Sequence, residues 1–596
     1  MDVRFPQTFF SLFISVLLCV AAVLIRAQDS PARQDVAHRL ETAGGEFPVV
    51  SQSQESPAYP GAFWSVGTDE ETADKLLSAM SDKEIVAQCF LVGWPTEHPA
   101  AGIMEWIRSR GIGGVKVFGW NGGNPDILAQ TVATFQTAEI TGHHGIPLLV
   151  ATDQEGGIVR HIRGDTSITP GNMAIGASGL PYDAYRTGFY IGRELRAIGV
   201  NMNFAPDIDV IVNPKDRVIG PRAFSSDPVK VGILGIAYMR GLDQAHVIAT
   251  AKHFPGHGNA AGDSHGMLPV IPDTFETVWN RDLLPYRMLI SAGLPAILGG
   301  HLNFPRITGD DAPASLSRYF KTVVMREKLG FKGVVITDDM YMEGALIYGD
   351  RHHLSFGQLC LLALKAGNDM IMLSRTPGID DEVWRTIYNA YENDPQSRTI
   401  IRAAVRRVLL MKLKYLKPAG HVPFVPDVTA LKQALPDRNG ENFFRDQAAR
   451  GITVIRDAWL PLEPRSGKKV LLAGDDQTFL QVGKKAYPDA SLFRFNSTAD
   501  AAALVAAASR ADTVVFCLSD PYTIDLLNDL RGIPAHVVVF SILTPMYLRE
   551  APWVQSAIAV YGWGIESYDA GFAALAGGYR PTGKLPIDLL WKGAGP

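Results

Sequence analysis

The segment 252–265, KHFPGHGNAAGDSH, concentrates titratable side chains of the types that carry out acid–base chemistry. Its glycines and its proline disfavour a regular helix, so we expect an irregular loop. Asp263 and His265 lie two residues apart in this segment. On a loop, a short carboxylate at that spacing can reach an imidazole nitrogen, fix its tautomer and favour its charged form. The pair therefore has the composition of a general acid and base.

Two alternatives stay open for this loop. His253, His257, Asp263 and His265 are all residue types that bind metal ions, although their spacing matches no zinc signature. A purely structural loop is the other alternative. We prefer the acid/base interpretation, which requires neither metal nor cofactor, because of a second motif further along the chain.

That motif, GVVITDDM at 333–340, is an apolar run that ends in two carboxylates. Successive residues of a strand point to opposite faces, so we expect one of Asp338 and Asp339 to face a site and the other to face away. The alternation does not say which is which. A carboxylate opposite a protonatable histidine is the minimum set for a glycosidase that works by double displacement.

The elements that must position these residues are short apolar runs, each continuous enough to be a strand buried on both faces. They are 89–93, 114–118, 147–151, 201–205, 247–251, 296–300, 333–337 and 370–374. Helical segments such as 126–139 and 277–292 separate most of them. Eight such units predict a (β/α)8 barrel, with a doubly wound sheet as the alternative.

Polar side chains follow several of these predicted strands. In a barrel they lie on one rim, where barrel active sites are built. They are Asp153, Asp207 and Asp209, Lys252 and His253, His301, and the pair Asp338 and Asp339. A single polar residue at a strand end usually has a structural role, but several that converge on one rim favour an active site.

Together these motifs resemble glycoside hydrolase family 3, and within it the NagZ-type β-N-acetylglucosaminidases, a kind of β-N-acetylhexosaminidase. The resemblance runs from about residue 72 to 375, and its most specific part is KHFPGHG at 252–258 with DSH at 263–265. Other parts are DQEGG at 153–157, IGPRAF at 219–224, ASLS at 314–317 and DDMYMEGA at 338–345.

The resemblance implies a role for each matching residue. Asp338 would be the nucleophile and His265 the acid/base, oriented by Asp263. The terminal sugar would be held by Asp153, Arg222, Lys252 and His253. The aspartate would accept hydrogen bonds from its hydroxyl groups, and the arginine and lysine would donate to its oxygens. Three positions depart from the family: Pro221 replaces its usual aspartate, His161 its usual arginine, and Asn259 a common aspartate. At the second position, Arg160 and Arg163 flank the place of the family's usual arginine.

The rest of the chain suggests further parts. An uncharged apolar run from Phe9 to Ile25 predicts an export signal or a retained anchor at 1–28, followed by a polar linker at 29–62. We expect the barrel at 63–416, a linker at 417–437, and a smaller three-layer α/β sandwich at 438–596, with strands at 469–473, 513–517, 536–540 and 556–560. The signal predicts an exported protein of the periplasm, the cell envelope or the cell exterior. Any contact with a membrane would be made by this N-terminal segment.

Charge and cysteine content exclude other classes. The net charge is −5 without a basic stripe, which argues against a nucleic-acid partner. Cys89, Cys360 and Cys517 sit in apolar stretches and are expected to be core residues, not a disulfide framework. The sequence does not indicate the oligomeric state.

The leading interpretation is a retaining hydrolase that releases terminal β-linked N-acetylglucosamine from peptidoglycan fragments or chitooligosaccharides. A phosphorylase that uses the same residues is the main alternative, since a neutral histidine would not repel phosphate as a carboxylate would. A metal-dependent barrel hydrolase and an inactive carbohydrate-binding protein are further alternatives.

Overall fold

The computed structural model describes residues 59–214, 216, 218–464 and 467–589. The predicted signal or anchor at 1–28 and nearly all of the linker at 29–62 lie outside these residues. Within the described part of the chain, no helix combines the length and apolarity that crossing a membrane requires.

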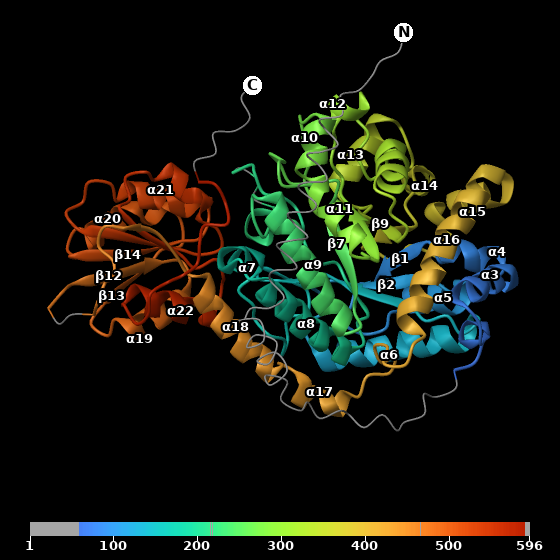
Figure 1. Ribbon diagram of the computed structural model, residues 1–596, viewed down its shortest axis with the longest axis horizontal. Helices are drawn as coiled ribbons and strands as arrows, with labels where there is room; N and C mark the ends of the chain where they lie inside the picture. Colours follow the sequence, from blue (N-terminus) through green and yellow to red (C-terminus); the bar gives the residue numbers. More distant parts are fainter. Residues whose placement is uncertain (1–58, 215, 217, 465–466, 590–596) are drawn as a thin grey trace, which may run out of the picture. The chain divides into compact units, whose positions relative to one another are not determined.

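A closed barrel of eight parallel strands forms the first part of the described chain (Figure 1). Around the barrel the strands follow the order β1-β10-β9-β8-β7-β6-β3-β2, so the predicted (β/α)8 barrel is confirmed. The strands are β1 (Phe90–Gly93), β2 (Gly114–Val117), β3 (Leu149–Thr152), β6 (Met202–Asn203), β7 (Ile248–Phe254), β8 (Ala296–Gly299), β9 (Val334–Asp339) and β10 (Met370–Leu373).

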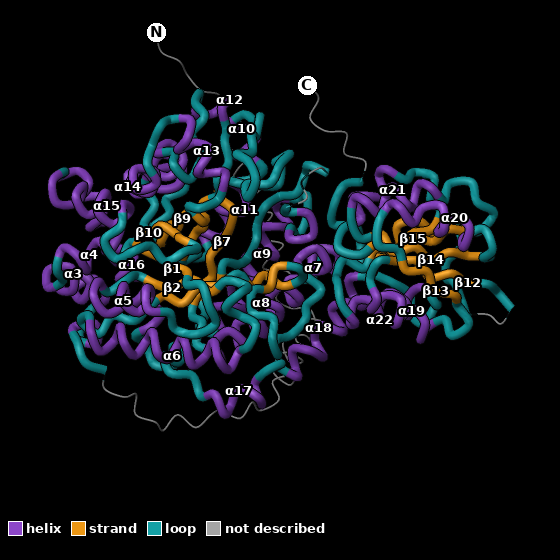
Figure 2. The backbone as a smooth tube through the Cα atoms, turned by 180° about the vertical axis from the view of Figure 1, so that it is seen from behind, coloured by secondary structure: helices purple, strands orange, loops and turns teal. Residues whose placement is uncertain are grey.

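Helices surround these strands, as Figure 2 shows. They are α3 (Asp69–Ala79), α4 (Asp82–Ala87), α5 (Ala101–Arg110), α6 (Pro125–Gly142), α7 (Asn172–Ser178), α8 (Pro181–Ile198), α9 (Pro228–Gln244), α10 (Phe275–Asn280), α11 (Leu283–Ser291), α12 (Pro305–Thr308), the π-helix η3 (Tyr319–Lys328), α13 (Glu343–Arg351), α14 (Phe356–Ala366), α15 (Glu382–Asn393) and α16 (Pro395–Leu416). The 3-10 turns η1 (Ala62–Trp64) and η2 (Gly220–Arg222), and the hairpin of β4 (Gln154–Gly156) and β5 (Val159–Arg160), complete this part.

Local sequence sets the helix ends. The Asn124 side chain accepts hydrogen bonds from the backbone N–H groups of Asp126 and Ile127, and Pro125 occupies the first turn of α6. At the carboxyl end of another helix, α8, Gly199 adopts the left-handed conformation and ends the helix. Caps of this kind satisfy the unpaired backbone groups at the helix ends, where the chain turns into the loops.

Three elements differ from the sequence prediction. Strand β7 continues to Phe254, which pairs with Gly299, so Lys252 and His253 belong to the strand and do not follow it. Strand β9 continues to Asp339 in the same way. The helix expected at 277–292 is two helices. Pro285 has no N–H, and in a continuous helix its ring would clash with the carbonyl of Arg281, the residue that follows α10.

The second part of the described chain is a mixed six-stranded sheet in the order β11-β16-β15-β14-β12-β13. The predicted α/β sandwich is confirmed, because alternate residues of β12, such as Leu471 and Leu472, enter separate apolar clusters on the two faces. The strands are β11 (Thr453–Asp457), β12 (Val470–Gly474), β13 (Ser491–Arg494), β14 (Thr513–Leu518), β15 (His536–Ser541) and β16 (Ser556–Ala559).

The helices of this part are α19 (Gln477–Ala486), α20 (Ala501–Ala508), α21 (Pro521–Asp529) and α22 (Ile565–Leu575), with 3-10 turns η4 (Thr498–Asp500) and η5 (Pro545–Glu550). Two further helices precede it, α17 (Val428–Ala434), within the stretch expected as a linker, and α18 (Arg438–Gly451). The sequence analysis missed β11 and β13. Both are edge strands of the sheet, and the side chains of β13 are largely exposed, so neither has the continuous apolar pattern of a buried strand.

The described cysteines, Cys89, Cys360 and Cys517, are all buried, as expected of core residues.

Candidate active site

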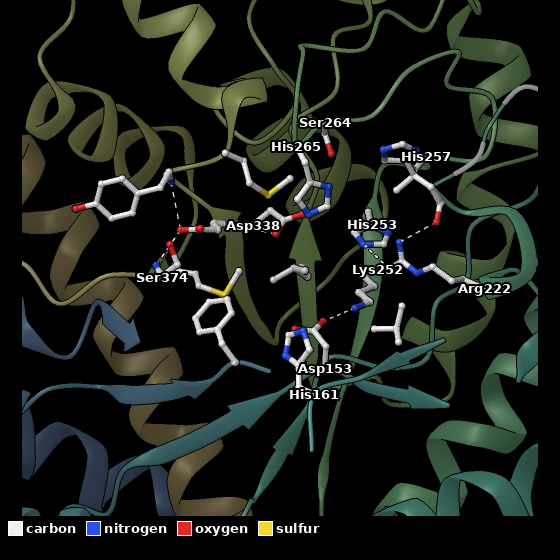
Figure 3. Close-up of a pocket in the computed structure, with 18 of the residues that line it drawn as sticks. Asp153, His161, Arg222, Lys252, His253, His257, Ser264, His265, Asp338 and Ser374 are labelled. Carbon is white, nitrogen blue, oxygen red and sulfur yellow. Dashed lines mark hydrogen bonds and ion pairs between the residues drawn. The ribbon is translucent and has the colours of Figure 1, made fainter. Parts of the chain in front are cut away.

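A cavity of about 540 Å³ lies at the carboxyl ends of the barrel strands (Figure 3). All of the residues that line it lie between 118 and 375, so its wall is made by the barrel. The wall includes six of the seven predicted site residues: Asp153, Arg222, Lys252, His253, His265 and Asp338. The seventh, Asp263, contacts His265 instead.

Both carboxylates at the end of β9 line the cavity, so the expectation that one of them faces away from the site is wrong, but their environments differ. Asp339 Oδ1 accepts hydrogen bonds from the backbone N–H groups of Tyr341, at 3.2 Å, and Ser374, at 2.9 Å. Asp339 is therefore occupied in tying two loops together. Burial alone would raise the pKa of Asp338, but the imidazoles of His253 and His301 outweigh it and hold this pKa below its ordinary value. Asp338 is thus an ionised carboxylate in the wall of the cavity.

Asp263 and His265 form the pair that the sequence predicts. His265 Nδ1 lies 2.7 Å from Asp263 Oδ1, and the same oxygen accepts from the His265 backbone N–H at 2.9 Å. Burial would raise the pKa of Asp263, but these hydrogen bonds keep it below its ordinary value. With Nδ1 engaged, Nε2 is the nitrogen left to exchange a proton with a bound molecule.

Asp153, just after β3, is held by two lysines. Lys116 Nζ lies 2.7 Å from Asp153 Oδ2, and Lys252 Nζ contacts Oδ1. Lys252 also lies 2.6 Å from Glu155 Oε1. Burial would raise the pKa of Asp153, but Lys116 and Lys252 outweigh it and hold this pKa well below its ordinary value. The result is a fixed, ionised hydrogen-bond acceptor on one side of the cavity.

Arg222 and His253 form a second fixed group. Arg222 makes a forked pair with Glu155, with Nε to Oε2 at 2.9 Å and Nη2 to Oε1 at 2.7 Å. Arg222 Nη2 also donates to His253 Nε2 at 3.1 Å, so Nε2 must be an acceptor. The proton of His253 then lies on Nδ1, 2.7 Å from Asp209 Oδ2.

The metal alternative can be compared with this geometry. The four loop residues considered as ligands do not gather around one point. Within the described part of the chain, the group close enough to share an ion is Asp207, Asp209 and His253. Both nitrogens of His253 are already engaged there, and the Arg222 guanidinium lies 3.5 Å from Asp207 Oδ2. A positive charge beside the three ligands disfavours a second cation.

His161 lies where the family that the sequence resembles is expected to have arginine, and it does not supply that charge. Its Nδ1 lies 3.2 Å from the carbonyl oxygen of Val117 and 3.3 Å from Lys116 Nζ. Burial, and then the Lys116 ammonium, lower the pKa of His161 to about 4. The cation that contacts Asp153 from this side is therefore Lys116, from β2.

Sequence reasoning missed several residues of the site. Lys116 is buried and interrupts the apolar run of β2, which was the available signal for it. Glu155 lies inside the DQEGG motif and holds both Arg222 and Lys252. His257 is buried in the cavity wall, with Nδ1 3.3 Å from Asp216 Oδ2.

The chain is similar in sequence and in fold to known proteins. Residues 80–411 match the glycosyl hydrolase family 3 N terminal domain. A β-hexosaminidase of Thiobacillus denitrificans is 34% identical over 329 residues, which are 54% of this chain and 84% of that protein. One of Methylococcus capsulatus is 35% identical over 311 residues, or 52% of this chain and 86% of that protein. The structure of a glycoside hydrolase family 3 β-N-acetylglucosaminidase from a Paenibacillus strain superposes with a TM-score of 0.77 at 27% identity, covering 86% of this chain and 99% of that one.

Proposed function

Because the chain belongs to glycosyl hydrolase family 3 and is a glycosidase, we propose that it is a retaining β-N-acetylhexosaminidase that acts through Asp338 and His265. The observation that carries the proposal is the placement of an ionised Asp338 and the His265–Asp263 pair in one cavity wall. The substrate is a carbohydrate with a terminal β-linked N-acetylglucosamine.

The order of the barrel strands gives the substrate a direction. Strands β3 and β9 stand opposite each other in the closed barrel, so Asp153 and Asp338 approach the cavity from opposite sides. Asp153, Lys252 and the Arg222 group supply acceptors and donors for hydroxyl and carbonyl oxygens. We place the far hydroxyls of the terminal sugar at Asp153 and its anomeric carbon at Asp338. The leaving group then extends past the anomeric carbon toward β9 and β10, and it departs from the ring face opposite Asp338.

The reaction has two displacement steps. In the first, Asp338 attacks the anomeric carbon, the glycosidic bond breaks, and His265 donates its proton to the leaving oxygen. In the second, neutral His265 takes a proton from water as that water attacks the same carbon and releases Asp338. Asp263 stays hydrogen-bonded to Nδ1, so one nitrogen of His265 serves both steps.

The natural leaving groups are those of peptidoglycan fragments or chitooligosaccharides. The apolar N-terminal run supports an exported protein, which would meet these glycans outside the cytoplasm.

Turnover of p-nitrophenyl N-acetyl-β-glucosaminide, compared with the β-glucoside, tests this function. We expect the first to be the preferred substrate, and NMR of the sugar released should show the β-anomer first. Preference for the glucoside, or release of the α-anomer, would contradict the proposal.

A further inference from the structure

One cation in the wall of the cavity pairs with no anion in the described part of the chain. Arg222 pairs with Glu155, and Lys252 pairs with Asp153 and Glu155. Arg375 also lines the cavity and is exposed, yet it makes no ion pair with any residue that the structure describes. Its guanidinium lies over the ring of Tyr341, 5.2 Å from the ring centroid.

Arg375 is held on the side where the leaving group departs. It follows Ser374, whose backbone N–H donates to Asp339 at 2.9 Å, and Asp339 also accepts from the N–H of Tyr341. The Tyr341 ring stacks on Phe356, with centroids 4.4 Å apart. The aromatic ring under the guanidinium is therefore fixed next to the strand end that carries Asp338.

We propose that Arg375 forms an anion subsite on the leaving-group side of the cavity. This inference rests on the proposed function, because the roles of Asp338 and Asp153 define that side. A guanidinium is suited to forked hydrogen bonds with an oxyanion, and its contact with Tyr341 limits its freedom before the anion arrives. The shared chemistry of the ligand is a small oxyanion next to the anomeric carbon.

Two sources would supply such an oxyanion. The first is a carboxylate on the leaving group, as on an acidic sugar that carries a carboxyl ether. The second is inorganic phosphate as the acceptor in the second step. An oxygen of phosphate would bond to the anomeric carbon while the bond to Asp338 breaks. The products would be the sugar 1-phosphate and a free carboxylate, with no proton to remove from the dianion.

The carboxylate source is tested with two aryl N-acetyl-β-glucosaminides, one with a 3-carboxyphenyl leaving group and one with its methyl ester. The ratio of kcat/KM for acid over ester is measured for the wild type and for Arg375→Gln. We expect the ratio to fall about tenfold in this variant, as the loss of one charged hydrogen bond implies. Arg438→Gln removes an exposed arginine from α18, outside the cavity wall, and should keep the wild-type ratio.

Salt and a conservative variant sharpen this comparison. High ionic strength should lower the wild-type ratio and leave that of Arg375→Gln almost constant, since an exposed ion pair is screened. Arg375→Lys should retain part of the ratio, because it keeps the charge but not the fork. Equal melting temperatures for the variants and the wild type would confirm that folding is intact.

The phosphate source is tested by adding inorganic phosphate to the ester assay and measuring N-acetylglucosamine 1-phosphate. A sugar phosphate that forms with the wild type and is lost in Arg375→Gln assigns the subsite to phosphate, whereas a change confined to the acid-to-ester ratio assigns it to a carboxylate. If Arg375→Gln changes neither readout, or lowers all reactions equally, the anion subsite is wrong. If the wild type turns over neither aryl glycoside, the proposed function itself fails, and the inference with it.

Discussion

Replacing His265 by alanine should slow different substrates by different factors. Proton donation helps a leaving group in proportion to its basicity, and general acid catalysis is typically worth about 10²–10⁴-fold. A sugar alkoxide needs that help and p-nitrophenolate largely does not. In the first step, His265→Ala should therefore slow a disaccharide by a factor within that range and an aryl glycoside far less.

Replacing Asp263, the hydrogen-bond partner of His265, should slow disaccharides less than replacing His265 itself. Asp263→Asn keeps an oxygen at the position of Oδ1, 2.7 Å from Nδ1, but removes the negative charge. A hydrogen bond to a charged group is worth about 1.5–3 kcal/mol. Because the side chains of His265 and Asp263 are 67% and 53% exposed, solvent screening reduces this to about 1 kcal/mol. That corresponds to a loss of roughly fivefold on disaccharides.

The assay compares kcat/KM for N,N′-diacetylchitobiose with that for p-nitrophenyl N-acetyl-β-glucosaminide in the wild type and both variants. Rapid quenching with the aryl substrate then measures the covalent intermediate. This should accumulate in His265→Ala, because no base activates water in the second step. If His265→Ala slowed both substrates equally and no intermediate accumulated, the acid/base role would be wrong and the loop would serve structure or binding.

Three other outcomes follow from the site. Chelation with EDTA should leave activity unchanged, because the His253 nitrogens are engaged by Asp209 and Arg222; loss restored by zinc would contradict this. Lys116→Met should lower the free energy of unfolding in urea by about 3–5 kcal/mol, since it leaves a carboxylate in a buried network without one partner; an unchanged value would show that Lys252 alone compensates Asp153. With a folded pKa of about 4, below the ordinary value of about 6.5, His161 should contribute stability that is present above pH 6.5 and lost as the pH falls toward 4, by up to about 3 kcal/mol. The His161→Gln variant should lose less unfolding free energy than the wild type between pH 6.5 and 4. Identical dependence of stability on pH in the two proteins would refute the lowered pKa of His161.

Much of the fold could be predicted because the barrel strands are buried on both faces. A run such as 370–374 is apolar throughout, and the structure places β10 there. Edge strands such as β13 have no such pattern and were missed. The break before α11 depended on Pro285, whose ring would clash with the backbone carbonyl four residues earlier in a continuous helix.

The site was predictable where its residues share a motif, and less so where the barrel brings distant ones together. Asp263 and His265 are close in sequence and in space. The different environments of Asp338 and Asp339 depend on Ser374, 35 residues away, whose N–H donates to Asp339. Lys116 could be assigned to Asp153 only when β2 and β3 were seen side by side.

Labelling with a fluorinated N-acetylglucosamine analogue that forms a stable glycosyl-enzyme would identify the nucleophile. Digestion and mass spectrometry should find the sugar on Asp338, whose carboxylate is ionised in the cavity wall. Asp338→Ala should lose nearly all turnover, and azide should restore part of it. A label on Asp339, or on any residue of the sheet domain that begins with β11, would contradict the mechanism.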